Sequence, residues 1–400
     1  MMLLPSAAQS LRTTLLWGGL FFSSLGFLAP ASAQSGRLDQ LFVQDTKGAM
    51  RQITGTVTSN GLEKVVVMRG DKEASFDNGR VDRIIWGQVS AAFREGQTYF
   101  DRGDFENAAA KFILATDEDE RPVIQAAARL AAGEALMLLG SSNPSRFALA
   151  IDQFDIFIAD HSANRDLPRA RDLQARATLL RGEEGDEKRA GELYRSLFEE
   201  GNSETPTKGY DQLSCLHAGL AAARALISAG ETLPARETLG VLTSASRLLL
   251  TSSEEDSPER PKLEALVAEA LLGEGFVFLA SGQARQAATF FGAQLQNSNN
   301  GAPAAQRFGA LLGLGEAALA QSAQDPAKLR EASLYFAQVA GLDYTDRDRT
   351  AQALLRLAET LSRLGDSDAA VQVRLRLQTL IDEYGDTPSA ATARTLLKAL

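Results

Sequence analysis

The chain has 400 residues, more than one compact hydrophobic core usually accommodates, so we expect either several domains or a repeat array. Hydrophobic residues make up 44% and charged residues 23%, which excludes a globally disordered chain. The formal net charge of −10 argues against nucleic acid and anionic membrane surfaces as partners. One cysteine and two histidines are too few ligands for a zinc-type site, so we expect no metal and no cofactor.

Residues 1–33 have the pattern of a secretion signal. Arg12 precedes an apolar run, Leu15 to Leu28, and Ala31-Ser32-Ala33 supplies the small residues that a signal peptidase accepts. The run is shorter than the roughly 20 residues that a membrane-spanning helix needs. We therefore predict cleavage after Ala33 and export to the periplasm or the exterior, with no stable membrane insertion afterwards. An uncleaved N-terminal anchor is the alternative.

Residues 44–87 have the two-residue periodicity of β-strands. Ile53, Gly55 and Val57 would share one face of a strand, and Asn60-Gly61 is typical of a hairpin turn. Further short strands are expected at 65–68, 73–76 and 81–86. The last of these, with the sequence VDRIIWG at 81–87, gives the segment a resemblance to the small SH3/Sm-like β-modules that precede helical repeats in some exported bacterial proteins. Such a module either binds a ligand or caps the first helices, and both interpretations remain open.

A helical repeat follows the β-segment. Within 91–115 the small residues Gly96 and Ala108 would let two antiparallel helices approach, and the large residues Tyr99 and Phe112 would fill the space around them. With the turn glycine and two further positions, this stretch resembles the tetratricopeptide repeat at Gly96, Tyr99, Gly103, Phe105, Ala108, Phe112 and Ala115. These are repeat positions 8, 11, 15, 17, 20, 24 and 27.

The same spacing recurs along the chain. Clear copies centre on Gly275 with Phe291, on Gly133 with Phe154 and on Gly315 with Phe336, the last two with a longer turn between the helices. Weaker copies centre on Ala190, Gly230 and Ala358. We predict a mainly α fold in which a right-handed α-solenoid of about seven helical pairs occupies 88–400, with a last solvating helix from Ala390. An unrelated alanine-rich helical bundle is the alternative.

Catalytic chemistry has little support in the sequence. Cys215 and His217 are two residues apart, so on one helix their side chains point about 200° apart and cannot form a dyad. The glycines stand at repeat positions rather than between a strand and a helix, so they do not form a phosphate-binding loop. We expect no catalytic residues and no enzyme activity. Paired carboxylates have no linear signature, and an enzyme or polysaccharide-handling module therefore remains an alternative.

Resemblance to the tetratricopeptide repeat implies a binding face. In that family, positions 2, 5, 9 and 12 of the first helices line the concave groove. On the best copies the groove candidates are Phe93, Gln97, Phe100, Glu134, Met137, Leu272, Phe276, Leu279, Leu312 and Glu316. They are mostly apolar or acidic, which favours an amphipathic helix or an extended apolar peptide as the partner. The competing interpretation is that these side chains pack on the adjoining repeat.

The expected function is a non-catalytic scaffold that binds other proteins in the cell envelope or outside the cell. The linker from Tyr384 to Ala390 is similar to the inter-repeat linkers of envelope repeat proteins, among them the helical lipoprotein of the outer-membrane barrel-assembly machinery and the periplasmic partner of the Tol system. An outer-membrane or periplasmic assembly or division factor is therefore a more specific alternative. The identity of the partner and the self-association of the chain have no signal in the sequence.

Overall fold

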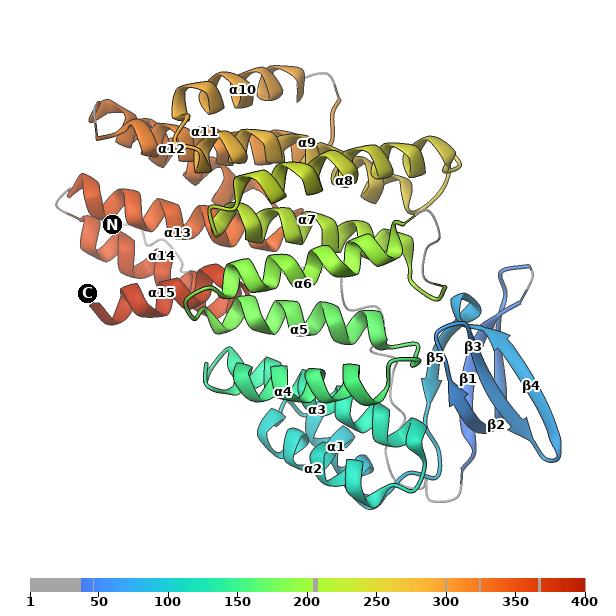
Figure 1. The fold of residues 1–400 in the computed structure, drawn as a ribbon. Coiled ribbons are helices and arrows are strands. Elements are labelled where there is room, and N and C mark those ends of the chain that lie inside the picture. The colour runs from blue at the N-terminus through green and yellow to red at the C-terminus, as the bar shows by residue number, and fades with distance from the viewer. Residues whose placement is uncertain are drawn as a thin grey trace, which may run out of the picture.

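The computed structural model describes residues 37–45, 47–203, 208–298, 301–323, 325–365 and 368–399. Within these ranges a five-stranded antiparallel sheet comes first and helices follow to the C-terminus (Figure 1). This confirms the predicted fold class, a small β-module before a helical repeat array. The predicted signal peptide, 1–33, lies outside the described residues.

The sheet is a curled meander with its own small core. Its strands are β1 (Asp39–Gln44), β2 (Met50–Asn60), β3 (Lys64–Arg69), β4 (Lys72–Asp77) and β5 (Val81–Ile85), in the spatial order β4-β3-β2-β1-β5. Alternate residues point inward, and the buried ones are Leu41, Val43, Val57, Val65, Val67 and Val81. The predicted start of the module at residue 44 is wrong for the sheet, because β1 already begins at Asp39 and pairs with both β2 and β5.

Fifteen helices occupy the rest of the described residues. They are α1 (Ala91–Asp101), α2 (Phe105–Glu118), α3 (Pro122–Gly140), α4 (Arg146–Asp160), α5 (Leu167–Arg181), α6 (Asp186–Gly201), α7 (Gln212–Ser228), α8 (Thr232–Ser252), α9 (Arg260–Ala280), α10 (Ala284–Asn297), α11 (Ala304–Gln321), α12 (Ala327–Leu342), α13 (Arg347–Leu364), α14 (Ala369–Glu383) and α15 (Pro388–Ala399). Each packs on the next along the chain. They form seven pairs and a terminal helix, as the sequence predicts.

Glycines at repeat position 8 hold the helices of a pair close together. A Cβ atom added at Gly96 would lie 2.8 Å from a ring carbon of Phe112, and one added at Gly133 would lie 2.5 Å from the ring of Phe154. Gly315 has the same relation to Phe336, also at 2.5 Å. Real Cβ atoms essentially never approach within 3.0 Å. The aromatic ring at position 24 therefore occupies the space that the missing side chain leaves, which is the packing that the repeat pattern predicts.

The turn within the first pair is set by local chemistry. Gly103 has a φ of +75°, a left-handed conformation that glycine adopts without a steric penalty. Asp104 follows as the N-cap of α2, and its side chain accepts a hydrogen bond from the backbone N–H of Asn107. The second helix therefore starts at the residue after the cap, Phe105.

A buried ion pair joins the sheet to the helices. Asp39 of β1 is fully buried, and its carboxylate accepts hydrogen bonds from the backbone N–H groups of Val57 and Gly87, both at 2.7 Å. Arg121, the residue before α3, donates to both oxygens of Asp39 at 2.5 and 3.2 Å. The same guanidinium donates to the carbonyl oxygens of Gly87 and Val57. One arginine from the helical part thus completes the hydrogen bonding of the sheet.

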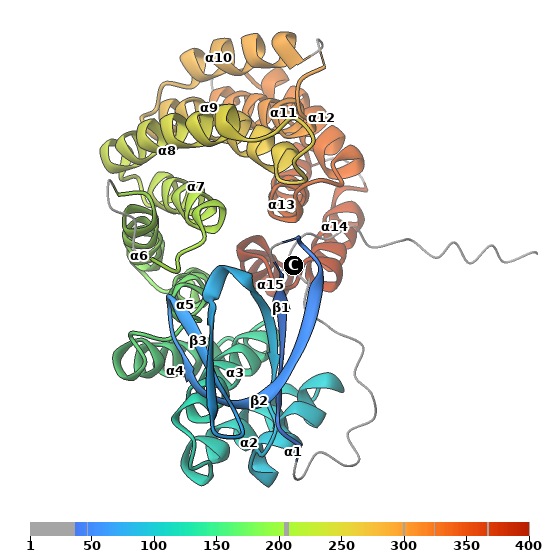
Figure 2. The same ribbon diagram turned by 90° about the vertical axis from the view of Figure 1, so that its right-hand side faces the viewer.

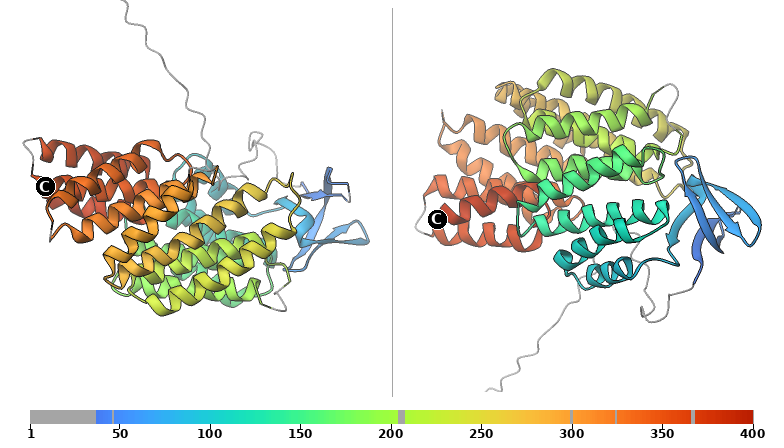
Figure 3. Two further views of the ribbon diagram at one scale, coloured as in Figure 1. Left: turned by 90° about the horizontal axis from the view of Figure 1, so that it is seen from above. Right: turned by 60° about the horizontal axis from the view of Figure 1, so that its bottom comes forward.

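The β2–β3 hairpin makes a second joint, with the loop between α4 and α5. The backbone N–H of Leu62 donates to the carbonyl of Ala163 at 2.8 Å, and the N–H of Arg165 donates to the carbonyl of Asn60 at 2.9 Å. The sheet consequently lies on one side of the helical array, against the ends of its helices, and the C-terminus of α15 lies on the opposite side (Figure 3). These contacts are those of a cap; a ligand-binding role of the sheet stays a prediction.

The helical array curves until its C-terminal part meets its middle. Figure 2 shows the helices in a ring, with α13 and α15 returning to the side of α5 and α7. Helix α15 contacts α5 as well as its neighbours α13 and α14. Ala390 and Ala393 of α15 are fully buried, so the last helix does more than present a polar face to solvent.

Candidate functional site

Three of the predicted groove residues belong to the hydrophobic core. Phe93, Leu272 and Leu312 are 3%, 2% and 3% exposed. Phe93 packs edge-on against Phe112, and Leu272 fills the space beside Gly309 on the next first helix. The groove prediction is wrong for these three, and the competing packing interpretation holds, because position 5 packs on the second helix of the pair at Phe93 and on the next first helix at Leu272.

Five further candidates are half-buried. Phe100 stacks edge-on against Phe105 and Phe112, and Phe276 stacks in the same way against the fully buried Phe291. Met137 and Leu279 border the adjacent core clusters. Gln97 is also half-buried. These side chains combine packing with residual exposure, and they are the part of the predicted groove that a partner could still reach.

The two acidic candidates form ion pairs with the next first helix. Glu134 of α3 pairs with Arg169 of α5 at 2.9 Å. Glu316 of α11 pairs with Arg356 of α13 at 2.8 Å. Burial raises the pKa of Glu134, and the charge of Arg169 counteracts part of that rise. Both glutamates stand at repeat position 9, so this position serves the joints between repeats.

A third pair of this kind joins α7 and α9. Arg224 of α7 and Glu269 of α9 lie 2.5 Å apart. With Gly230 at repeat position 15 and Gly275 at position 8, Arg224 and Glu269 occupy positions 9 and 2 of their repeats. Repeat numbering could therefore have placed both on the inner face, but neither is among the ten predicted residues. Their repeat positions were therefore visible in the sequence, although the sequence could not show that the two side chains form an ion pair.

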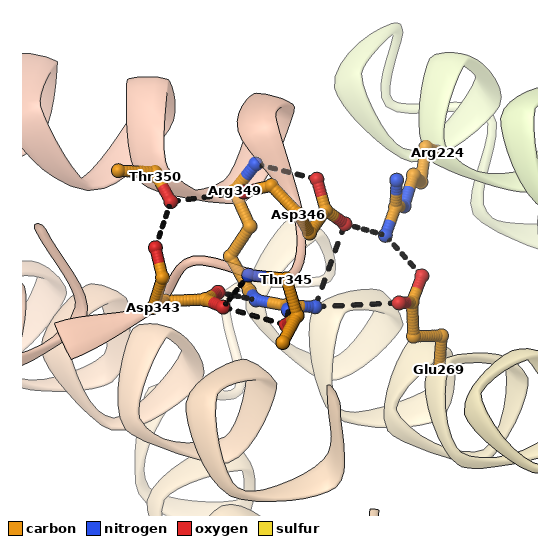
Figure 4. A network of polar contacts seen from close by, with 7 residues as sticks. All are labelled: Arg224, Glu269, Asp343, Thr345, Asp346, Arg349 and Thr350. Atoms are coloured by element: carbon orange, nitrogen blue, oxygen red, sulfur yellow. Dashed lines mark hydrogen bonds and ion pairs between the residues drawn. The ribbon is translucent and has the colours of Figure 1, made fainter. Parts of the chain in front are cut away.

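Arg224 and Glu269 belong to a larger polar network at the start of α13 (Figure 4). Asp346, the N-cap of α13, lies 3.4 Å from Arg224 and accepts a hydrogen bond from the backbone N–H of Arg349. The guanidinium of Arg349 donates to Asp343 at 2.5 Å and lies 3.3 Å from Glu269. The network thus links α7, α9 and the α12–α13 loop.

The charges of this network stabilise its acidic members. Burial alone would raise the pKa of Asp346, but the nearby charges of Arg224 and Arg349 lower it below its ordinary value. The pKa of Arg224 is raised, since Glu269 and Asp346 outweigh the opposing effect of burial. Both groups are therefore charged at neutral pH, and their pairing is ionic.

A second contact between distant segments lies near the first. Arg176 of α5 lies 3.6 Å from Asp386, in the loop before α15, and Asp386 also pairs with Arg347 at 2.9 Å. Nearby, burial raises the pKa of Asp172 and of Asp348. The inner face around α5, α7 and α13, which holds none of the ten predicted groove residues, is consequently charged.

The single cysteine and the two histidines are at least partly buried, and burial shifts the pKa of each. Cys215 is 1% exposed, and burial raises the pKa of its thiol to about 12, so the reactive thiolate is scarce at neutral pH. Burial lowers the pKa of both His161 and His217. Within the described ranges, no three His, Cys, Asp or Glu side chains gather in a way that could hold a metal ion.

Two pockets of the described residues lie away from the predicted groove. One lies beside the turn at Gly282–Gln286 and the end of α11. The other lies between the β2–β3 hairpin, the start of α3 and the α4–α5 loop. Neither is lined by a groove candidate or by the carboxylates of raised pKa.

Helix α3 is long and apolar enough to cross a membrane by length and composition. In the structure it packs between α2 and α4, and most of its apolar stretch is buried there. Its composition is explained by its place in the protein core.

Comparisons with known proteins identify no family. No protein-family model matches the chain, and no curated protein matches it. Among solved structures, a tetratricopeptide repeat protein from Parabacteroides merdae is similar over 77% of this chain and 96% of its own length, at 12% identity and a TM-score of 0.44. A Rap protein complexed with competence and sporulation factor is similar over 77% of this chain and 86% of its own, at 14% identity and a TM-score of 0.38. Because both TM-scores are below 0.5, the description of the helical pairs as tetratricopeptide-like rests on their own packing.

Proposed function

We propose that the chain is a non-catalytic scaffold that binds protein segments on the inner face of its helical ring. The observation that carries the proposal is the composition of that face. Half-buried apolar side chains such as Phe276 and Leu279 stand at groove positions of α9, and the ion-paired Glu316 stands at a groove position of α11. An amphipathic helix or an extended segment with apolar and charged residues complements such a surface.

The remaining chemistry supports a scaffold over an enzyme. Cys215 is buried as a thiol, and the carboxylates of raised pKa lie outside the two pockets described above. Catalytic groups need access to a substrate as well as a tuned pKa. For an enzyme or a polysaccharide-handling module, the carboxylates would have to line a cleft.

We also propose that the protein acts in the cell envelope or outside the cell. The signal-like residues 1–33 and the linker from Tyr384 to Ala390 support this location. An assembly or division role at the outer membrane is the more specific form of the proposal. Cell fractionation tests the location: the mature chain should begin at Gln34 and be recovered outside the cytoplasm, and a full-length cytoplasmic chain would contradict it.

Crosslinking in the native host tests the binding face. Phe276→Ala with Leu279→Ala should reduce the yield of the crosslinked partner about fivefold or more, since a central apolar anchor usually contributes over 1 kcal/mol to binding. The matched control is Leu334→Ala, which truncates a side chain of α12 that is 64% exposed and lies outside the predicted groove. Equal losses in both variants, or no loss in either, would refute the assignment of the inner face.

A further inference from the structure

Apolar contacts join helices that follow one another in the chain. One buried cluster spans α1 to α5, another joins α5, α6 and α7, and a third joins α13, α14 and α15. Among the described residues, no such cluster combines a side chain of α5 or α7 with one of α12 to α15. Buried apolar clusters therefore connect consecutive helices around the whole ring. They do not connect α12 to α15 with α5 and α7, where the ring closes.

At that return the side-chain contacts are ionic. Arg224 of α7 faces Asp346 at 3.4 Å, and Arg176 of α5 faces Asp386 at 3.6 Å. We call these four residues the seam. Their partners are 122 and 210 positions apart in the chain, so the seam joins segments that only the curvature of the array brings together.

Solvent reaches most of the seam. The side chains of Arg176 and Asp386 are 41% and 46% exposed, and Arg224 is 46% exposed, whereas its partner Asp346 is 17% exposed. The Arg176–Asp386 pair is therefore weak and screened by salt, and the Arg224–Asp346 pair is screened less; the apolar clusters elsewhere in the ring are not screened. Raised ionic strength should therefore weaken the seam before it weakens any other joint.

Closure also hides part of the inner face. Asp346 and Asp386 belong to the loops before α13 and α15, which lie against the inner sides of α7 and α5. While the seam is closed, these loops occupy space that a bound segment would need. A partner on the inner face would have to displace them or enter past them.

We propose that the seam is an electrostatic latch that holds the C-terminal part, α12 to α15, against α5 and α7, and that its release opens the ring. The opening of the ring is independent of the proposed function, whereas the entry of a partner through this opening rests on the proposed function. Release of the latch breaks the two ion pairs of the seam and none of the apolar clusters, because no buried cluster of the described residues joins α5 or α7 to any of α12 to α15.

Small-angle X-ray scattering of the full mature chain without any partner tests the latch. The radius of gyration of the wild type should rise between 0.05 and 0.5 M NaCl, where the Debye length falls from above about 10 Å to well below it. The variant Arg176→Gln with Arg224→Gln should have the larger radius already at low salt and lose the salt dependence. Amide hydrogen exchange at the start of α13 should be faster in this variant.

The matched control removes the same charge elsewhere. Arg195→Gln with Arg236→Gln breaks two exposed ion pairs, one within α6 and one between the consecutive helices α8 and α9, and should keep the salt dependence of the wild type. A wild-type radius and exchange pattern independent of salt would overturn the latch, even if the double variant failed to fold. Partner capture is scored separately: a salt-dependent ring that captures nothing would contradict the proposed function and leave the latch standing.

Discussion

Replacing Gly315 by alanine tests whether position 8 glycines determine the packing of each pair. The new Cβ would lie 2.5 Å from the ring of Phe336, which is 0.9 Å short of the 3.4 Å at which ordinary contacts begin. Phe336 is fully buried among the side chains of its cluster, so the ring has no free direction in which to move. Overpacking of this kind costs about 1–3 kcal/mol. Alanine regains about 1 kcal/mol of helix propensity, so we expect a net destabilisation of roughly 0–2 kcal/mol.

The matched control is Gly240→Ala in the middle of α8. A Cβ at Gly240 meets nothing within 4 Å, so only the propensity gain of about 0.5–1 kcal/mol remains and this variant should be more stable than the wild type. Urea unfolding followed by circular dichroism should separate the two variants by about 1–3 kcal/mol. Adding Phe336→Leu to Gly315→Ala should cost less than the sum of the single changes, because the smaller side chain relieves the clash.

Equal stabilisation by Gly315→Ala and Gly240→Ala would refute this reasoning. It would mean that the two helices of the pair can separate by an ångström without loss, and that the aromatic ring at position 24 does not need the glycine. Strictly additive effects of Gly315→Ala and Phe336→Leu would lead to the same conclusion.

Further predictions concern the sheet joint and the buried ionisable groups. Asp39→Asn should destabilise the sheet by about 3–5 kcal/mol, because Arg121 keeps a half-buried charge without its counterion. Protease sensitivity of the sheet measures this, with Asp71→Asn at an exposed turn residue as control. Residues 34–90 expressed alone lack Arg121, and we expect them to show a collapsed amide spectrum where a dispersed one would indicate an autonomous module. Cys215 should resist alkylation at pH 8 in the native protein and react fully in urea, because burial raises its pKa to about 12; fast native labelling would contradict its buried position. Burial raises the pKa of Asp172 in the folded state, so the folded protein is most stable with this carboxyl protonated, below the unfolded pKa of about 3.9, and loses this stability as the pH rises. Asp172→Asn should therefore be more stable than the wild type at pH 7, and the difference in unfolding free energy should disappear at pH 3.

The inner face shows which properties of a side chain can be predicted from its position in the repeat. Repeat numbering predicted Glu134 and Glu316 as groove residues, whereas in the structure both form ion pairs with the next first helix. It also placed Phe93 and Leu272 in the groove, although both are core residues. Position in a repeat gives the direction of a side chain relative to its own helix, whereas exposure depends on how closely the neighbouring repeat packs. That distance is a property of the whole superhelix.

Local pattern determined the elements of this protein. The spacing of glycine and aromatic residues defined seven helical pairs, because each contact between Gly133 and Phe154 or between Gly96 and Phe112 lies within one pair and depends only on nearby residues. The alternation of Val65 and Val67 marked a strand in the same way. The burial of Asp39 could not be predicted from local pattern. A buried carboxylate is tolerated there only because Arg121, which follows α1 and α2 in the chain, pairs with it.

A length of 400 residues is compatible with separate domains or with one repeat array. The sequence by itself decided for an array with a small sheet in front, because helix pairing is encoded over a few tens of residues. Only the tertiary structure decided that the array closes on itself and that charged side chains meet across the closure. The curvature accumulates from small rotations at every joint, so no single stretch of sequence contains it. For the same reason Arg224 and Asp346, 122 positions apart, become neighbours only in the folded ring.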